Sequence, residues 1–447
     1  MILTAILQFE RKHCMGRKRV DMLIIAVVFI AVLAVIGAIW FINSNRMPEI
    51  KLPTPVMPSP NAYDYYTSAG NLIVDSKKID EIVYEQTFSR TRTSPKVYSL
   101  AEKEDLLASN EQALQMMRDG FDYECMAPVR RSFDALFPEF QHFQNLGRLL
   151  YIESQIKSAK GDYAGAMDSC LDGIYFGVNA PSGGLIIHKL VGISNQKIVR
   201  EEAWKLLEQM DAGECRAATR RLEQIISKQV PVAKTLEEEK WFGIGAFQEA
   251  VQKETMGDFI SSAIYDDNSL RSRIVWNIRA LKTSKQKVIR NYSDYMDQLI
   301  ENAKKPYALH LPDPPTPDDP VNSVLAPVLN RARFSDELNQ LQNELLLLKL
   351  AIRAYKLDNG RYPASLSDLT PDYIKSIPRD RFVLKGPIRY KQQGSSYVLY
   401  SVGPDGKDDG GKPIDNIKSP SRPNADELRY HVEDKSKGDI VAGINLK

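Results

Sequence analysis

The sequence has few histidines and cysteines, the residues whose short motifs most often indicate catalysis or metal binding. Its 447 residues include five histidines and four cysteines. No HExxH, CxxC or G-x-S-x-G spacing occurs, so the signatures of metalloproteases, zinc ribbons, thioredoxin-like proteins and α/β-hydrolases are missing. Gly183-Gly184 lacks the Lys-Ser/Thr pair of a phosphate-binding loop. The sequence therefore predicts a protein that is not an enzyme.

A strong excess of charge of one sign is also missing. The chain has 59 Lys+Arg against 57 Asp+Glu, a formal net charge of +2. Proteins that bind nucleic acid through its phosphates carry a basic excess or a basic patch. The local run Lys282, Lys285, Lys287 and Arg290 is typical of a solvated helix face. We expect no nucleic-acid partner.

Residues 22–42 contain neither a charge nor a proline. A helix of this length spans about 30 Å, the thickness of the hydrocarbon core of a bilayer. The leader, residues 1–21, is basic, whereas Arg46 is the one charge shortly after the run. The positive-inside rule therefore predicts a single-pass membrane protein with a cytoplasmic N-terminus and the bulk of the chain periplasmic or extracellular.

A cleaved signal peptide is the alternative interpretation of this run. Its apolar core would be about 7–15 residues long and would end in small residues. Here the run is longer and ends with the bulky Trp40-Phe41, which favours an uncleaved anchor. Met15 begins a compact Met-Gly-Arg-Lys-Arg leader, so it is a second possible start of the chain.

The remainder divides at two proline-rich stretches. Residues 43–60 are predicted to be an extended spacer, and residues 306–329 a linker between two domains. Between them, residues 61–305 carry apolar residues at three- and four-residue spacing, which predicts a helical domain. Gly161-Asp162-Tyr163 followed by Ala166 resembles the turn of a tetratricopeptide hairpin, without a second copy 34 residues away. A degenerate TPR-like repeat and an ordinary helical bundle both remain open.

The C-terminal domain, residues 330–447, is predicted to begin with a long amphipathic helix over 330–358. Its apolar residues recur in alternating steps of four and three: Phe334, Leu338, Leu341, Leu345, Leu348, Ile352 and Tyr355. Two β-favouring runs, 388–391 and 397–402, flank Gly394 and predict an antiparallel hairpin. The predicted fold class is therefore mainly α, with a small α+β C-terminal domain.

Three segments of this domain carry a family resemblance. They are residues 351–363 at the end of the long helix, Ile377-Pro378-Arg379-Asp380, and residues 400–411, which read Tyr-Ser-Val-Gly-Pro-Asp-Gly-Lys-Asp-Asp-Gly-Gly. Together they resemble the head domain of the major pseudopilin of type II secretion, over about residues 332–416. The whole chain looks like a bacterial membrane-anchored protein that carries such a head after a helical domain.

The N-terminus departs from the pseudopilin pattern. Gly16 is followed by Arg17-Lys18-Arg19, and Asp21 stands where that family has Glu. Charges at these positions argue against prepilin processing. We therefore do not expect a pilus subunit.

The resemblance implies a calcium site in the acidic loop that follows the hairpin. Calcium takes six to eight oxygen ligands, which carboxylates and backbone carbonyls in a glycine-rich loop can supply. The predicted ligands are Asp405, Asp408, Asp409 and Asp415. A solvated Asp-Gly turn is the alternative interpretation of the same residues.

Three functional hypotheses follow. The first is a membrane-anchored, extracytoplasmic, non-enzymatic protein: an envelope scaffold or protein-interaction module related to type II secretion pseudopilins, with a protein partner in the cell envelope. The second is a membrane-tethered extracytoplasmic hydrolase whose site is assembled in the helical domain from residues distant in sequence. In the third, the head docks among pseudopilins through its long helix.

Overall fold

The computed structural model describes residues 50–88, 97–253, 285–309, 311–317, 320–416 and 429–445. The predicted membrane span, residues 22–42, lies outside them. Among the described residues, no helix is both long and apolar enough to cross a membrane. Residues 52–249, 292–318 and 322–447 form one compact unit, and the contacts described below lie within it.

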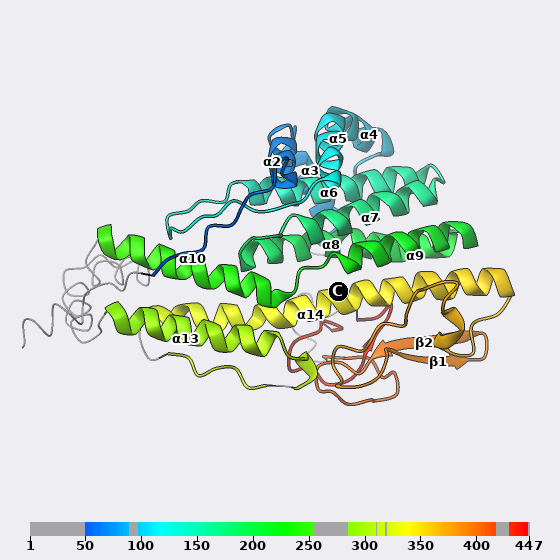
Figure 1. Cartoon of the computed structure of the whole chain (residues 1–447). Coiled ribbons are helices and arrows are strands. Elements are labelled where there is room, and N and C mark those ends of the chain that lie inside the picture. The colour runs from blue at the N-terminus through cyan, green and yellow to red at the C-terminus, as the bar shows by residue number, and fades with distance from the viewer. Residues whose placement is uncertain are drawn as a thin grey trace, which may run out of the picture. The chain divides into compact units, whose positions relative to one another are not determined.

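The fold is mainly helical and has a small antiparallel sheet near its C-terminal end, as predicted (Figure 1). The helices are α2 (Ala62–Asn71), α3 (Ser76–Phe88), α4 (Leu100–Ser109), α5 (Glu111–Asp119), α6 (Glu139–Ala159), α7 (Tyr163–Asn179), α8 (Ile186–Leu206), α9 (Ala212–Ser227), α10 (Val232–Lys253), α13 (Lys285–Ala303) and α14 (Pro320–Asn359). Short 3-10 turns are η2 (Gly120–Asp122), η3 (Leu207–Gln209), η4 (Tyr307–Leu309) and η5 (Leu366–Leu369). The strands are β1 (Arg389–Gln393), β2 (Ser396–Ser401) and β3 (Ile440–Val441).

Helices α6, α7 and α8 form the centre of the helical domain. The Gly-Asp turn noted in the sequence joins α6 to α7: Gly161 has φ +82°, and the Asp162 carboxylate accepts from the backbone N–H of Gly165 to cap α7. Helices α7 and α8 approach each other closely at Gly177 and Gly192. A Cβ on Gly192 would lie 2.3 Å from the carbonyl oxygen of Gly177, so only glycine permits this backbone contact.

Helix α14 is the predicted long helix, and it begins at Pro320 rather than at residue 330. Proline suits the first turn of a helix, because its fixed φ is already helical and the N–H it lacks would have no partner there. The centre of the predicted apolar seam is buried, with Leu341, Leu345 and Leu348 fully covered, and its ends at Phe334, Leu338 and Tyr355 are partly exposed. The intervening Leu346 is covered as well. Helix α14 is buried on more than one side, because it contacts both the helical domain and the C-terminal segment around the sheet.

The sheet has the order β1-β2-β3. Strands β1 and β2 form the predicted hairpin, with Gln393 opposite Ser396 and Gly394 at φ +60° in the turn. Strand β3 adds a short antiparallel pairing that brings Ile440 opposite Ser401. The sequence did not indicate this third strand. Its pairing places the C-terminal residues beside the acidic loop that follows β2.

Candidate functional site

The acidic loop after β2 contains the four predicted metal ligands, and the side chains of Asp405, Asp408 and Asp415 have separate partners. Asp408 Oδ1 accepts from the Tyr400 hydroxyl at 3.0 Å and from the backbone N–H of Gly410 at 2.9 Å. Its Oδ2 lies 3.5 Å from Nε of Arg389. The Gly410 N–H holds the pKa of Asp408 below its usual value, with Tyr400 acting in the same direction.

Asp405 and Asp415 each form hydrogen bonds or ion pairs with other residues. Asp405 accepts from the backbone N–H of Lys407 at 3.2 Å, an ordinary Asx turn. Asp415 forms a two-point ion pair with Arg429, at 2.9 and 2.7 Å, and this pair lowers the pKa of Asp415. Within the part of the chain that the structure describes, no three Asp, Glu, His or Cys side chains gather closely enough to hold a metal ion.

Asp439 is the residue of this region that the sequence did not reveal. Its side chain is fully buried, and its two oxygens accept from the backbone N–H groups of Asp409 (3.2 Å) and Gly411 (2.6 Å). Burial raises the pKa of Asp439, the negative charges of Asp408 and Asp409 raise it further, and the two N–H donors oppose this. The only sequence signal was Gly438-Asp439, a common dipeptide well separated from the loop.

The negative charges of Asp408 and Asp409 thus act on the buried Asp439 and raise its pKa. Calcium, which takes oxygen ligands, would neutralise this repulsion, but in the described residues these carboxylates would have to move closer together to hold it. Asp405, Asp408 and Asp415 each already have a partner that a bound ion would have to replace or share.

A second concentration of polar groups joins α8 to α14 in the protein interior. Arg200 is 3% exposed, and its guanidinium donates to the side-chain oxygens of Asn339 (2.9 Å), Asn343 (2.7 Å) and Gln342 (2.5 Å). Gln196 Oε1 accepts from the side-chain amides of Asn339 (3.0 Å) and Asn343 (2.8 Å). We call these five residues the amide cluster. Its hydrogen bonds connect residues 139 to 147 positions apart.

The charge of Arg200 is balanced by amide dipoles in this cluster, because each hydrogen-bond partner that the structure gives its guanidinium is an amide oxygen. Burial lowers the pKa of Arg200 to about 10, so the group is still charged at neutral pH. A buried charge of this kind is costly unless every donor is matched. The amide cluster therefore specifies how α8 and α14 pair.

Ion pairs hold α14 on two sides. Lys189 of α8 lies 2.9 Å from Asp336, with both side chains buried. From the C-terminal segment, Arg381 donates to Glu337 at 3.1 Å and to Glu344 at 2.7 Å. Helix α14 is thus fixed by charge both to the helical domain and to the segment that leads to the sheet.

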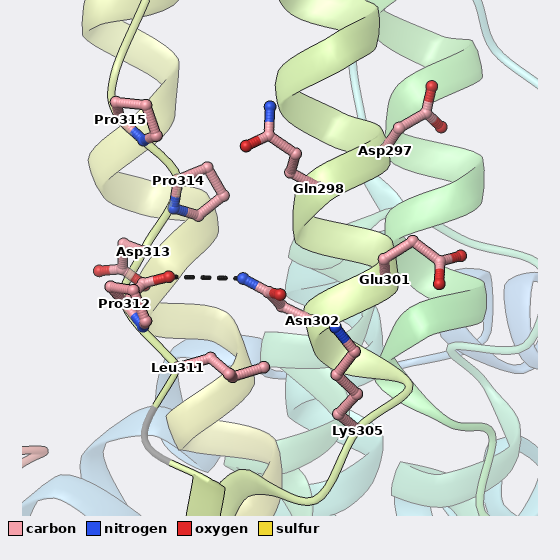
Figure 2. A pocket seen from close by; sticks show the side chains of 10 residues that line it. All are labelled: Asp297, Gln298, Glu301, Asn302, Lys305, Leu311, Pro312, Asp313, Pro314 and Pro315. Carbon is pink, nitrogen blue, oxygen red and sulfur yellow. Dashed lines mark hydrogen bonds between the residues drawn. The ribbon is translucent and has the colours of Figure 1, made fainter.

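A pocket of about 520 Å³ lies between the C-terminal half of α13 and the proline-rich segment 311–315 (Figure 2). Asn302 points toward that segment and donates to the carbonyl oxygen of Pro312 at 3.4 Å, whereas Asp297 and Glu301 point away from it. Asp297 is paired with Lys240, and Glu301 with Lys304. The lining holds no Ser, Thr, Cys or His, so a nucleophile of the hydroxyl, thiol or imidazole type is missing from it.

His188 is a buried histidine in the first turn of α8. Its Nδ1 accepts from the backbone N–H of Leu185 at 3.0 Å, so it caps the first turn of the helix. Its ring packs edge-on against Phe137 and Phe140, with centroids 5.5 and 4.7 Å away. Burial lowers the pKa of His188 to about 4, while nearby Glu139 opposes the shift. A side chain that is 4% exposed has no path to a substrate, which makes this histidine a capping residue.

Comparison with known proteins gives no family assignment. No protein-family model matches the chain. No curated protein and no solved structure matches it either.

Proposed function

We propose that this chain is a membrane-anchored, extracytoplasmic, non-enzymatic scaffold of the cell envelope, related to type II secretion pseudopilins and binding a protein partner there. The observation that carries the proposal is the position of α14. The amide cluster and Lys189–Asp336 bind it to the helical domain, and Arg381 binds it to the C-terminal segment. A helix fixed on both sides suits a protein that holds domains in place.

The relation to pseudopilins rests on the order of elements: a long helix, a hairpin and an acidic loop. They fall at the sequence positions that carry the resemblance. The same helix argues against docking among pseudopilins through α14. Its apolar seam, including Leu341, Leu345 and Leu348, is already covered within the chain. A partner would have to bind another surface.

The membrane topology can be tested with a thiol reagent that does not cross membranes. Cys125, Cys170 and Cys215 are buried, so Cys14 is the native thiol expected to react, and only from the cytoplasm. We expect Leu384→Cys, at a half-exposed position, to be labelled on cells whose outer barrier is opened, with Cys14→Ser removing the background. In the native chain, Cys14 should react only after the membrane is dissolved. Labelling of Cys14 from outside, or none at position 384, would contradict this topology.

Calcium is the proposed ligand of the acidic loop, and thermal unfolding of the full chain in detergent tests it. A ligand that binds only the folded state raises the unfolding midpoint as its concentration rises. We expect millimolar calcium to raise the midpoint relative to chelator, and the double variant Asp405→Ala/Asp408→Ala to abolish the rise. Asp439→Asn should abolish it too.

The matched control is Asp372→Ala, which removes an exposed carboxylate outside the loop and should leave the calcium response intact. An identical midpoint with calcium and with chelator would rule out the metal site. The resemblance to the pseudopilin head would then concern the fold alone.

A further inference from the structure

The proline-rich segment 311–317, part of the stretch predicted to be a linker, runs beside α13 (Figure 2). It reads Leu-Pro-Asp-Pro-Pro-Thr-Pro, so every residue in it is a proline or directly precedes one. Proline fixes its own φ at about −65°, and it disfavours the α region for the residue before it. Together these two restrictions favour a polyproline II helix for the whole segment.

The burial of the segment has the period of such a helix. A polyproline II helix has about three residues per turn, so residues three apart lie along one edge. One edge of the segment is covered or half-covered, and it holds Leu311, Pro314 and Pro317. The other two edges are exposed, and they carry Pro312 with Pro315, and Asp313 with Thr316. The segment is therefore turned to the protein by one edge and to solvent by two.

The contacts of the segment leave most of its backbone available to another molecule. Asn302 of α13 donates to the carbonyl oxygen of Pro312, and among the described residues this is the only hydrogen bond to the backbone of 311–317. A polyproline II helix forms no hydrogen bonds of its own, so its other carbonyl oxygens can accept from a binding partner. The pocket of about 520 Å³ between α13 and residues 311–315 offers space beside them for a partner's side chain.

Two exposed prolines one turn apart are recognised by a distinct kind of protein surface. Aromatic-lined grooves bind polyproline II segments, and they gain affinity because the helix is already formed before binding. Next to the edge of Pro312 and Pro315, the exposed carboxylate of Asp313 points away from α13 (Figure 2). A carboxylate at this place favours a groove that has a basic side chain beside its aromatic rings.

The other proline-rich stretch that the structure describes, residues 52–60, has a different pattern. Its exposed prolines are Pro53 and Pro60, whose separation is not a whole number of polyproline II turns. The exposed residue one turn after Pro53 is Val56. Pro53 therefore provides a control for the loss of an exposed proline outside a paired edge.

We infer that residues 311–317 are the docking segment for a partner protein whose aromatic-lined groove, flanked by a basic side chain, takes the edge formed by Pro312 and Pro315. The inference rests on the proposed scaffold function and deepens it by naming the class of the partner. The covered edge keeps the segment in one orientation on the protein. Because the segment is held in its binding conformation, little conformational entropy is lost when the partner binds.

Photocrosslinking in cells that naturally make the protein tests this docking. A photoreactive phenylalanine in place of Thr316 stands on an exposed edge and removes no proline. We expect a discrete crosslink to a second protein. In the full chain that carries Pro312→Ala and Pro315→Ala, this crosslink should weaken about tenfold or more, because two anchoring side chains are lost. The matched control, Pro53→Ala, should leave it unchanged.

A synthetic peptide with the sequence of residues 309–319 gives a second measurement, which does not depend on the folding of a variant. The peptide should compete for the crosslink. It should also change the tyrosine or tryptophan fluorescence of the purified partner, because the groove that it enters is aromatic. The same peptide with Pro312→Ala and Pro315→Ala should do neither.

Other results would overturn the inference. These are an adduct with lipid, an adduct with a second copy of this chain, and a crosslink that persists in the double variant or in the presence of the native peptide. A lysine-reactive crosslinker, applied to the same cells, separates the failures. If it captures a partner while position 316 captures none, the docking segment is wrong and the scaffold stands. If neither captures a protein, the proposed scaffold function fails as well.

Discussion

Replacing Arg200 with alanine should lower the free energy of unfolding by about 3–5 kcal/mol, the cost typical of removing one partner from a buried charged network. The substitution leaves the side-chain oxygens of Asn339, Gln342 and Asn343 buried without their donor. It also opens a cavity between α8 and α14, which adds to the loss. Urea unfolding, followed by circular dichroism on the full chain in detergent, measures the change.

Arg216→Ala is the matched control, because it removes an arginine of α9 that pairs with Asp358 at the protein surface. Exposed pairs contribute little, so its unfolding midpoint should stay close to that of the native chain. If the two variants unfolded at the same urea concentration, the amide cluster would not specify the packing of α14. Arg200→Lys should fall between them, since one ammonium group cannot reach all three oxygens with the geometry of a guanidinium.

The second large effect is a loss of stability in mild acid caused by His188. The usual pKa of histidine is 6.5, and burial lowers that of His188 to about 4. Between these values the unfolded chain binds a proton that the folded chain does not. The free energy of unfolding therefore falls as the pH drops from 6.5 toward 4, by up to about 3 kcal/mol. Above pH 6.5 this contribution is constant.

His188→Gln isolates this effect. Glutamine at the third position of a helix can accept from the N-cap N–H as His188 does from Leu185, but it does not titrate. We expect its unfolding free energy to depend less on pH than that of the native chain between pH 4 and 6.5. Parallel pH curves for the native chain and His188→Gln would show that His188 is not responsible.

The sequence predicted the features that have a local signal. The alternating steps of Leu341, Leu345 and Leu348 predicted a buried helix seam, and β-favouring runs around Gly394 predicted the hairpin. Apolar periodicity and turn chemistry act over a few residues, so one sequence is enough to see them. The Gly161 turn between α6 and α7 was found in the same way. Whether it belongs to a degenerate repeat remains a hypothesis.

The sequence did not reveal the polar contacts of the interior. Gln196, Arg200, Asn339 and Asn343 are polar residues on helices, and periodicity assigns such residues to the solvent face. They are buried because they satisfy one another across more than 130 positions of sequence, a pairing with no local pattern. Asp439 was missed for the same reason, since its partners are backbone N–H groups of a loop 28 to 30 residues earlier.

The long stretch of sequence between α8 and α14 also determines when the amide cluster can form during synthesis. Ribosomes add roughly 5–20 residues per second, so the partners of Arg200 emerge about 7–30 s after it. During that interval the face of α8 that carries Arg200 and Gln196 has only water to bind. A chain released before Asn343 would keep this face open permanently. Because proteases remove chains that stay incompletely folded, we expect the first two thirds of the chain to survive in cells only when the last third has been made.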